Sequence, residues 1–123
     1  MNSDFLMFNS RDEMLRIKVQ NIVYFESDGN YTHMVTQNRL RPSLCMSLGN
    51  MEKLLALKLR DKASMFIRVG RRYIINRNFI YMVSPIKQRL VLSDFATFAY
   101  QLDVSKDALS RMKSLLTEIS KQK

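Results

Sequence analysis

The sequence has little that could crosslink the chain or bind a metal. It contains one cysteine, Cys45, so no disulfide can form within the chain and no cysteine-rich metal site is available. His33 is the only histidine, and no cluster of carboxylates surrounds it in the sequence, so a histidine-based metal site is not expected. The glycine-rich patterns G-x-x-x-x-G-K-[ST] and G-x-G-x-x-G, which cradle phosphates, are missing. We therefore expect no cofactor.

Long apolar runs and flexible stretches are also scarce. No apolar run approaches the roughly 18 residues that a membrane span needs, and residues 1–4 show no basic region leading into an apolar one, as a signal peptide would. Three glycines and two prolines leave no flexible linker. The 123 residues, 46% of them apolar, suffice for one packed core. We expect a single cytoplasmic domain over residues 1–123 that has no contact with a membrane.

Acidic residues are missing from one long stretch. The whole chain has 20 Lys and Arg against 11 Asp and Glu, which gives a net charge of +9. Residues 62–93, here called the basic segment, hold seven basic side chains, five of them arginine, and no acidic one. The other 91 residues are nearly balanced, with 13 basic and 11 acidic side chains. This concentration indicates one contact surface for a polyanion, although a solvated basic face without a ligand has the same composition.

Apolar periodicity predicts a mainly β domain of antiparallel sheets with short helices, the last of them at the C-terminus. A helix over 48–59 follows Ser47, a potential cap, and a second begins near Ser105. The second has apolar residues at helical spacing, namely Ala108, Met112, Leu115, Leu116 and Ile119. Short strands are expected at 5–8, 15–19, 22–25, 31–36, 40–45, 66–69, 73–75, 79–83, 89–92 and 97–104. So few helices between so many strands argue against a parallel sheet.

A catalytic site has little support in the sequence. Glu26 and Asp28 lie close together, but a turn over 26–30 explains them more simply than an acid/base pair does. His33 is expected to be a surface or half-buried strand residue. Cys45 is expected to be a small buried apolar residue rather than a nucleophile paired with His33. We therefore expect that the protein is not an enzyme.

The stretch 66–77 combines an apolar strand, a glycine and clustered arginines. Gly70 permits a positive φ or a close approach of the backbone to a ligand. Arg71 and Arg72 follow directly, so their side chains leave opposite sides of an extended backbone. Arginine presents a planar fork that suits phosphates and guanine edges. Asn76 either reads a base or closes a turn with its side chain, and we favour the turn.

Four blocks of the sequence stand in an order and spacing that match a known family. They are IVYFESDGNY (22–31), SLGNMEKLL (47–55), FIRVGRRYIIN (66–76) and LDVSK (102–106). The first, third and fourth are similar to the family patterns I-x-Y-I-E-S-x-G-N-Y, F-x-R-x-H-R-S-Y-x-V-N and l-P-V-S-R. Over about residues 10–116 the chain thus resembles the LytTR DNA-binding domain, the output domain of many bacterial response regulators in two-component systems.

The resemblance implies antiparallel sheets with small helices, and loops that read successive major grooves of bent double-stranded DNA. The family's base-contacting positions fall on Asn30, Arg71 and Lys106. Arg68, Arg72 and Arg77 are then expected to contact phosphates or to contact further bases. The chain departs from the family at Gly70, where His is frequent, at Arg72, where Ser is usual, and at Lys106, where Arg is commoner. The family's target sequences therefore do not transfer to this chain.

Some of these positions have a second interpretation. Asn30 could supply the left-handed residue of the Asp28-Gly29-Asn30 turn, and Lys106 could be an ordinary surface residue in a first helical turn. Arg68 could run along the core and form a salt bridge. Two alternatives to DNA binding stay open: a protein-interaction or signalling adaptor that uses the basic face, and a small RNA-binding β domain. Against RNA, the basic segment lacks the interleaved exposed aromatics that stack on bases.

The expected partners also follow from the resemblance. The main partner is double-stranded DNA, with repeated promoter sites and a dimer on the DNA as further expectations. A receiver domain or a kinase could deliver the signal, because 123 residues leave no room for a receiver domain with its phosphoacceptor aspartate. The chain could be a fragment of a longer regulator or a regulator that acts alone.

Overall fold

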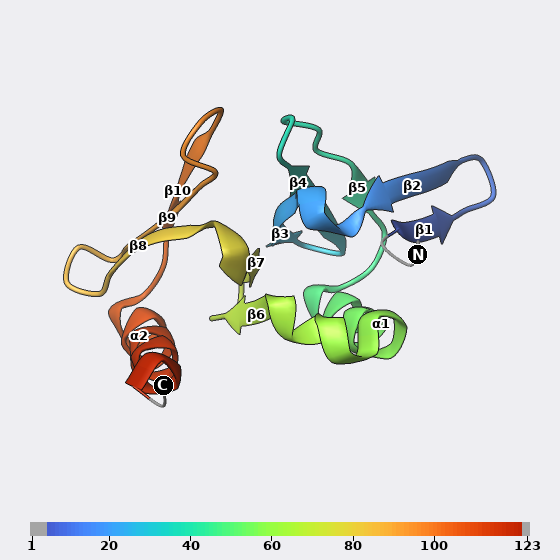
Figure 1. The fold of residues 1–123 in the computed structure, drawn as a ribbon. Coiled ribbons are helices and arrows are strands. Elements are labelled where there is room, and N and C mark those ends of the chain that lie inside the picture. Colours follow the sequence, from blue (N-terminus) through green and yellow to red (C-terminus); the bar gives the residue numbers. More distant parts are fainter. Residues whose placement is uncertain (1–4, 122–123) are drawn as a thin grey trace.

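The computed structural model describes residues 5–121, with the side chains of residues 5–117 (Figure 1). Within this part the strands are β1 (Phe5–Asn9), β2 (Met14–Lys18), β3 (Ile22–Asp28), β4 (Tyr31–Thr36), β5 (Ser43–Leu44), β6 (Phe66–Val69), β7 (Tyr73–Asn76), β8 (Ile80–Ser84), β9 (Arg89–Ser93) and β10 (Ala99–Asp103). The helices are α1 (Leu48–Leu59) and α2 (Lys106–Lys121), and the 3-10 turns are η1 (Val19–Asn21), η2 (Arg60–Met65) and η3 (Arg77–Phe79).

The strands form three antiparallel sheets, which confirms the expected fold class. The largest sheet has the strand order β5-β4-β3-β7-β6, a second has the order β10-β9-β8, and β1 pairs with β2 alone. The strand β3 lies at the centre of the five-stranded sheet, where Glu26 is opposite His33 on β4 and opposite Tyr73 on β7. The two edges of this sheet are β5 and β6. The edge strand β6 lies between α1 and α2 (Figure 1).

Two apolar cores lie on the two faces of the five-stranded sheet. Successive side chains of a strand point to opposite faces, so Phe25 belongs to one core and Tyr24 to the other. The core around Phe25 includes α1 and the β1–β2 hairpin, for example Met51 and Leu6. The core around Tyr24 includes the three-stranded sheet and α2, for example Leu109. Both faces are covered, so polar and charged side chains gather at the ends of the strands.

Both predicted helices are present and begin as expected. The Ser47 hydroxyl accepts a hydrogen bond from Asn50 N–H at 3.1 Å and caps α1. The Ser105 hydroxyl accepts one from Ala108 N–H at 3.2 Å just before α2. Ala108, Leu109 and Met112 are buried on α2, whereas Leu115 is 51% exposed. The side chain of Ile119, predicted for the same apolar stripe, lies outside the described part.

The predicted turn over 26–30 is wrong in its extent. The strand β3 continues to Asp28, and only Gly29 and Asn30 form the connection to β4. Gly29 has a φ of 62°, while Asn30 is not among the residues with positive φ. The polar run Glu26-Ser27-Asp28 stays extended because all three residues pair with β4, Glu26 also pairs with β7, and Ser27 N–H donates to the Arg72 carbonyl.

Cys45 is exposed, so its predicted burial is wrong. The predicted strand over 40–45 shrinks to Ser43–Leu44, after which the chain leaves the sheet toward the α1 cap. Leu44 packs against the core around Phe25, so the next side chain points outward. The other strands differ from prediction by at most two residues at their ends. For example, Val19 and Phe79 were predicted to lie in strands but belong to the 3-10 turns η1 and η3.

The β9–β10 loop is organised by one carboxylate. Asp94 accepts hydrogen bonds from the N–H groups of Ala96 (3.0 Å), Thr97 (2.7 Å) and Phe98 (3.1 Å), and from the Thr97 hydroxyl. These bonds, above all the one from the Thr97 hydroxyl, hold the pKa of Asp94 well below its usual range. The loop holds Phe95 at a φ of 67°, a conformation that a bulky side chain rarely adopts.

Asp94→Asn should change how stability depends on pH. Because the folded-state pKa is depressed, the charged carboxylate stabilises the fold above the unfolded-state pKa of about 3.9. This contribution falls away as the pH drops from there through the folded-state value. The Tm of the wild type should exceed that of the variant at pH 7, and the difference should shrink below about pH 4. A difference that stays constant down to pH 3 would contradict this account.

Candidate nucleic-acid interface

Two turns of the five-stranded sheet meet at the same end of it. The end of β3 lies beside the start of β7, where Ser27 N–H donates to the Arg72 carbonyl at 2.8 Å. This places the β3–β4 turn, with Asn30, near the β6–β7 turn, residues 70–72. The first turn of α2 joins them, because a Cβ on Gly70 would lie 3.7 Å from Ala108 Cβ. We call the surface formed by Asn30, Arg71, Arg72, Lys106 and Arg111 the turn surface.

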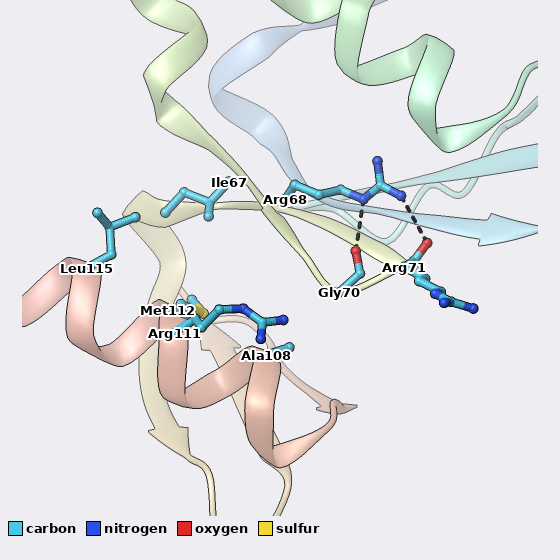
Figure 2. Close-up of a pocket in the computed structure, with 8 residues that line it drawn as sticks. All are labelled: Ile67, Arg68, Gly70, Arg71, Ala108, Arg111, Met112 and Leu115. Atoms are coloured by element: carbon cyan, nitrogen blue, oxygen red, sulfur yellow. Dashed lines mark hydrogen bonds between the residues drawn. The ribbon is translucent and has the colours of Figure 1, made fainter.

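Arg68 organises the β6–β7 turn from within. Its Nε donates to the Gly70 carbonyl at 3.0 Å and its Nη2 to the Arg71 carbonyl at 3.3 Å (Figure 2). Its Nη1 forms a salt bridge with Glu52 of α1 at 2.9 Å. The guanidinium is therefore bound within the protein, as the salt-bridge interpretation of Arg68 expected. Gly70 has a φ of 64°, in keeping with the prediction of a positive φ.

Arg72 is bound by a carboxylate of the sheet. Its Nη2 lies 2.5 Å from Glu26 Oε2, and Arg41 Nη2 lies 3.2 Å from Glu26 Oε1. The Arg72 guanidinium also lies over the Tyr73 ring, 5.2 Å from its centroid, which adds a cation–π contact. Two of the five arginines of the basic segment, Arg68 and Arg72, are thus neutralised by carboxylates from outside it.

Arg71 is the arginine of this turn that points away from the body of the protein (Figure 2). It is exposed, and among residues 5–117 no carboxylate forms an ion pair with it. Its backbone carbonyl is fixed by Arg68, so the turn is held while the guanidinium is free. A planar donor held out on an ordered turn can form a bidentate contact with a guanine edge or a phosphate.

A cavity of about 350 Å³ separates the β6–β7 turn from α2. Its lining combines apolar side chains with three arginines, namely Ile67, Arg68, Gly70, Arg71, Ala108, Arg111, Met112 and Leu115 (Figure 2). The gap is small because Gly70 has no side chain where it faces Ala108. The turn therefore lies close enough to α2 for Arg71 and Arg111 to border the same depression.

The β3–β4 turn is tied to the neighbouring strand by His33. The Nε2 of His33 lies 2.8 Å from Asp28 Oδ2, and its Nδ1 lies 2.7 Å from Ser43 Oγ on β5. The hydrogen bond with His33 holds the pKa of Asp28 below its usual value. His33 is half-buried on its strand, as predicted, with its side chain 12% exposed. Because Gly29 takes the positive φ, the left-handed interpretation of Asn30 is wrong, and Asn30 stands exposed beside it.

The comparisons with known proteins agree with this geometry. A family model, the LytTr DNA-binding domain, matches residues 12–117. The chain belongs to the LytTR family. It is similar in fold to a Bacillus cereus domain described as the LytTr DNA-binding domain of a methyl-accepting/DNA response regulator. That likeness has a TM-score of 0.64 at 24% identity and covers 92% of this chain and 96% of the other. No curated protein sequence matches significantly.

The match confirms the resemblance predicted from the four sequence blocks, over nearly the same residues. LytTR domains are DNA-binding rather than catalytic domains. Within residues 5–121, no helix is long and apolar enough to span a membrane. In the same part of the chain, no group of three or more His, Cys, Asp and Glu side chains is placed to hold a metal ion.

One residue of the basic segment of this LytTR domain, Arg77, lies away from the turn surface. Arg77 lies in η3, at the far end of β7 from Arg71. It follows Asn76, which is 1% exposed. The Asn76 amide donates to the Ile22 carbonyl and its oxygen accepts from Asn78 N–H, both at 2.9 Å. Asn76 thus closes a turn, as favoured from the sequence. Arg77 is separated from Arg71 because the whole of β7 lies between them.

Lys106 and Arg111 complete the LytTR turn surface from α2. Lys106 is exposed at the first residue of the helix, directly after the Ser105 cap. Arg111 lies outside the basic segment, and sequence reasoning missed it. It follows the buried Ala108 by three residues, so its place on the helix could be deduced from the periodicity. Its approach to Gly70 could not, because that depends on how α2 packs against β6.

Proposed function

We propose that this LytTR domain binds double-stranded DNA sequence-specifically as a cytoplasmic bacterial transcription regulator. Its turns would read the major groove while basic side chains hold phosphates. The supporting observation is that Asn30, Arg71 and Lys106, from three separate parts of the sequence, lie at one end of the fold. These are the positions to which the family resemblance assigns base contacts.

The side chains of the turn surface suit different parts of the task. Arg71 can bind the O6 and N7 atoms of guanine with its planar fork, and Asn30 can bind the N6 and N7 atoms of adenine. Lys106 and Arg111 present cations beside them for either bases or phosphates. Arg68 acts indirectly, because it holds the carbonyls of Gly70 and Arg71. Arg77 would contact phosphate only where bent DNA reaches the other end of β7.

A salt titration tests the electrostatic part of this proposal. If about six phosphates are neutralised, log K for duplex DNA should fall with log[salt] with a slope on the order of −5. The slope can be measured by fluorescence anisotropy with a labelled random duplex and with a selected one. A slope near zero on both duplexes would exclude phosphate neutralisation as the source of binding.

Selection of bound fragments from random duplex DNA tests the sequence-specific part. We expect an enriched motif, repeated at a fixed spacing if neighbouring copies of the domain bind together. Competition with RNA and with an acidic protein checks the alternatives. If the domain is an RNA-binding domain, RNA should displace the duplex DNA from it. If it is a protein adaptor, the acidic protein should do so. Recovery of fragments without any common motif would leave a non-specific DNA-binding domain.

A further inference from the structure

Glu26 is a carboxylate held among arginines next to the turn surface. Its two oxygens bind Arg72 and Arg41, at 2.5 Å and 3.2 Å. The Glu26 side chain is 18% exposed, against 59% for Arg72 and 50% for Arg41. The carboxylate is therefore an inner part of the sheet, and the two arginines reach in to it from the β6–β7 turn and the β4–β5 connection.

The position of Glu26 does not depend on these arginines. Its backbone is paired on both sides, opposite His33 on β4 and Tyr73 on β7. By contrast, Arg72 and Arg41 lie in connections between strands and extend long, largely exposed side chains. The oxygens of a carboxylate and of a phosphate bind the guanidinium fork in the same way. Glu26 thus occupies the donors that a DNA phosphate would otherwise bind.

We propose that Glu26 acts as an internal substitute for DNA phosphate. It withholds Arg72 and Arg41 from the DNA backbone and so limits how many phosphates the domain neutralises. This inference rests on the proposed DNA binding, and it revises the expectation for Arg72. Arg72 stays bound to Glu26 and does not contact DNA phosphate, while Arg71, its neighbour in the same turn, remains free for DNA.

The Glu52–Arg68 pair shows why Glu26 is the informative carboxylate. Arg68 also donates to the carbonyls of Gly70 and Arg71, and its side chain is only 31% exposed. Removal of Glu52 would leave Arg68 bound to the turn. Within residues 5–117 the Arg72 guanidinium has no such second hydrogen-bonded anchor, only its contact with the Tyr73 ring. Removal of Glu26 should therefore free Arg72 for phosphate.

The main test is Glu26→Gln, measured by salt titration on a labelled random duplex. Each additional phosphate neutralised adds about −0.9 to the slope of log K against log[salt]. With one or two arginines released, the slope should become steeper by about 0.9 to 1.8. The ratio of affinities at 50 mM and 200 mM salt should accordingly grow by about 3- to 12-fold. An unchanged slope would overturn the inference.

Two further variants separate the released arginine from the changed net charge. Glu13→Gln alters the net charge equally. However, Glu13 is exposed in the β1–β2 turn, away from the turn surface (Figure 1). The slope of log K against log[salt] for this variant should therefore stay near that of the wild type. Arg72→Ala should scarcely change the slope in the wild type, because Glu26 already binds Arg72. In the Glu26→Gln background it should remove about 0.9 of the gain. Equal effects of Arg72→Ala in both backgrounds would contradict the proposal.

A measurement without DNA distinguishes failure of this inference from failure of the proposed function. Inorganic pyrophosphate is titrated while the Arg72 Nε–H signal is followed by NMR. The signal should move at lower pyrophosphate concentrations in Glu26→Gln than in the wild type. If it does so although no variant binds duplex DNA, the role of Glu26 stands and DNA binding falls. If duplex binding is normal but the signal responds identically in both proteins, the role of Glu26 falls alone.

Discussion

Arg71→Ala should weaken binding to the selected DNA site by about 5- to 150-fold, which corresponds to about 1–3 kcal/mol. The expected loss is large because a bidentate contact carries base discrimination that no neighbouring side chain replaces. The fold should tolerate the change. Arg71 is exposed, and within residues 5–117 its side chain forms no ion pair, so the free energy of unfolding should change by less than about 0.5 kcal/mol.

The comparison that decides the role of Arg71 uses two duplexes and two substitutions. Affinity for the selected duplex should fall much more than affinity for a random one, and the preference at one base position should flatten. Arg71→Lys keeps the charge but loses the planar fork, so it should retain most of the random-duplex affinity and lose the preference. Equal losses on both duplexes would assign Arg71 to the phosphate contacts and remove it from the base readers.

The prominence of Arg71 could be predicted from sequence because its signals are local. A glycine with positive φ and two arginines stand next to each other in the chain, and the family pattern covers the same residues. Helix positions were predictable for a similar reason, since a serine cap and the spacing of apolar residues suffice to place α1 and α2. Local chemistry decides these features, and the surrounding structure does not alter them.

The partners of the charged side chains could not be predicted in this way. Glu26 reads as a turn residue when only its neighbours Ser27 and Asp28 are considered. In the fold it lies on the central strand, and its carboxylate meets arginines that are 15 and 46 residues away in the chain. The same is true of Arg111, which reaches the turn surface only through the packing of α2 against β6. Charge counted along a chain does not show which charges neutralise one another.

The prediction that Cys45 is buried was wrong for a related reason. A free cysteine is usually buried as a small apolar residue, and the return of the chain over 40–45 suggested a full strand. The chain needs only Ser43 and Leu44 in the sheet before it turns toward the Ser47 cap. Where a strand ends decides which side chain faces the core, and this end is determined by the position of the following helix.

Leu109→Ala should destabilise the fold more than any surface change considered above. Leu109 is fully buried, at 0% exposure, in the core that joins α2 to both larger sheets. Truncation of such a leucine removes buried apolar contacts and leaves a cavity, which lowers the free energy of unfolding by about 2–5 kcal/mol. Urea unfolding followed by circular dichroism measures the loss.

Leu115→Ala is the matched control, because it makes the same substitution on the same helix. Leu115 is 51% exposed, so its loss should lower the free energy of unfolding by less than about 1 kcal/mol. The pair also tests the site, since α2 carries Lys106 and Arg111 to the turn surface. Below its unfolding midpoint Leu109→Ala should still bind DNA, with affinity reduced only in proportion to the unfolded fraction. Equal destabilisation by the two substitutions would mean that α2 is not anchored through Leu109.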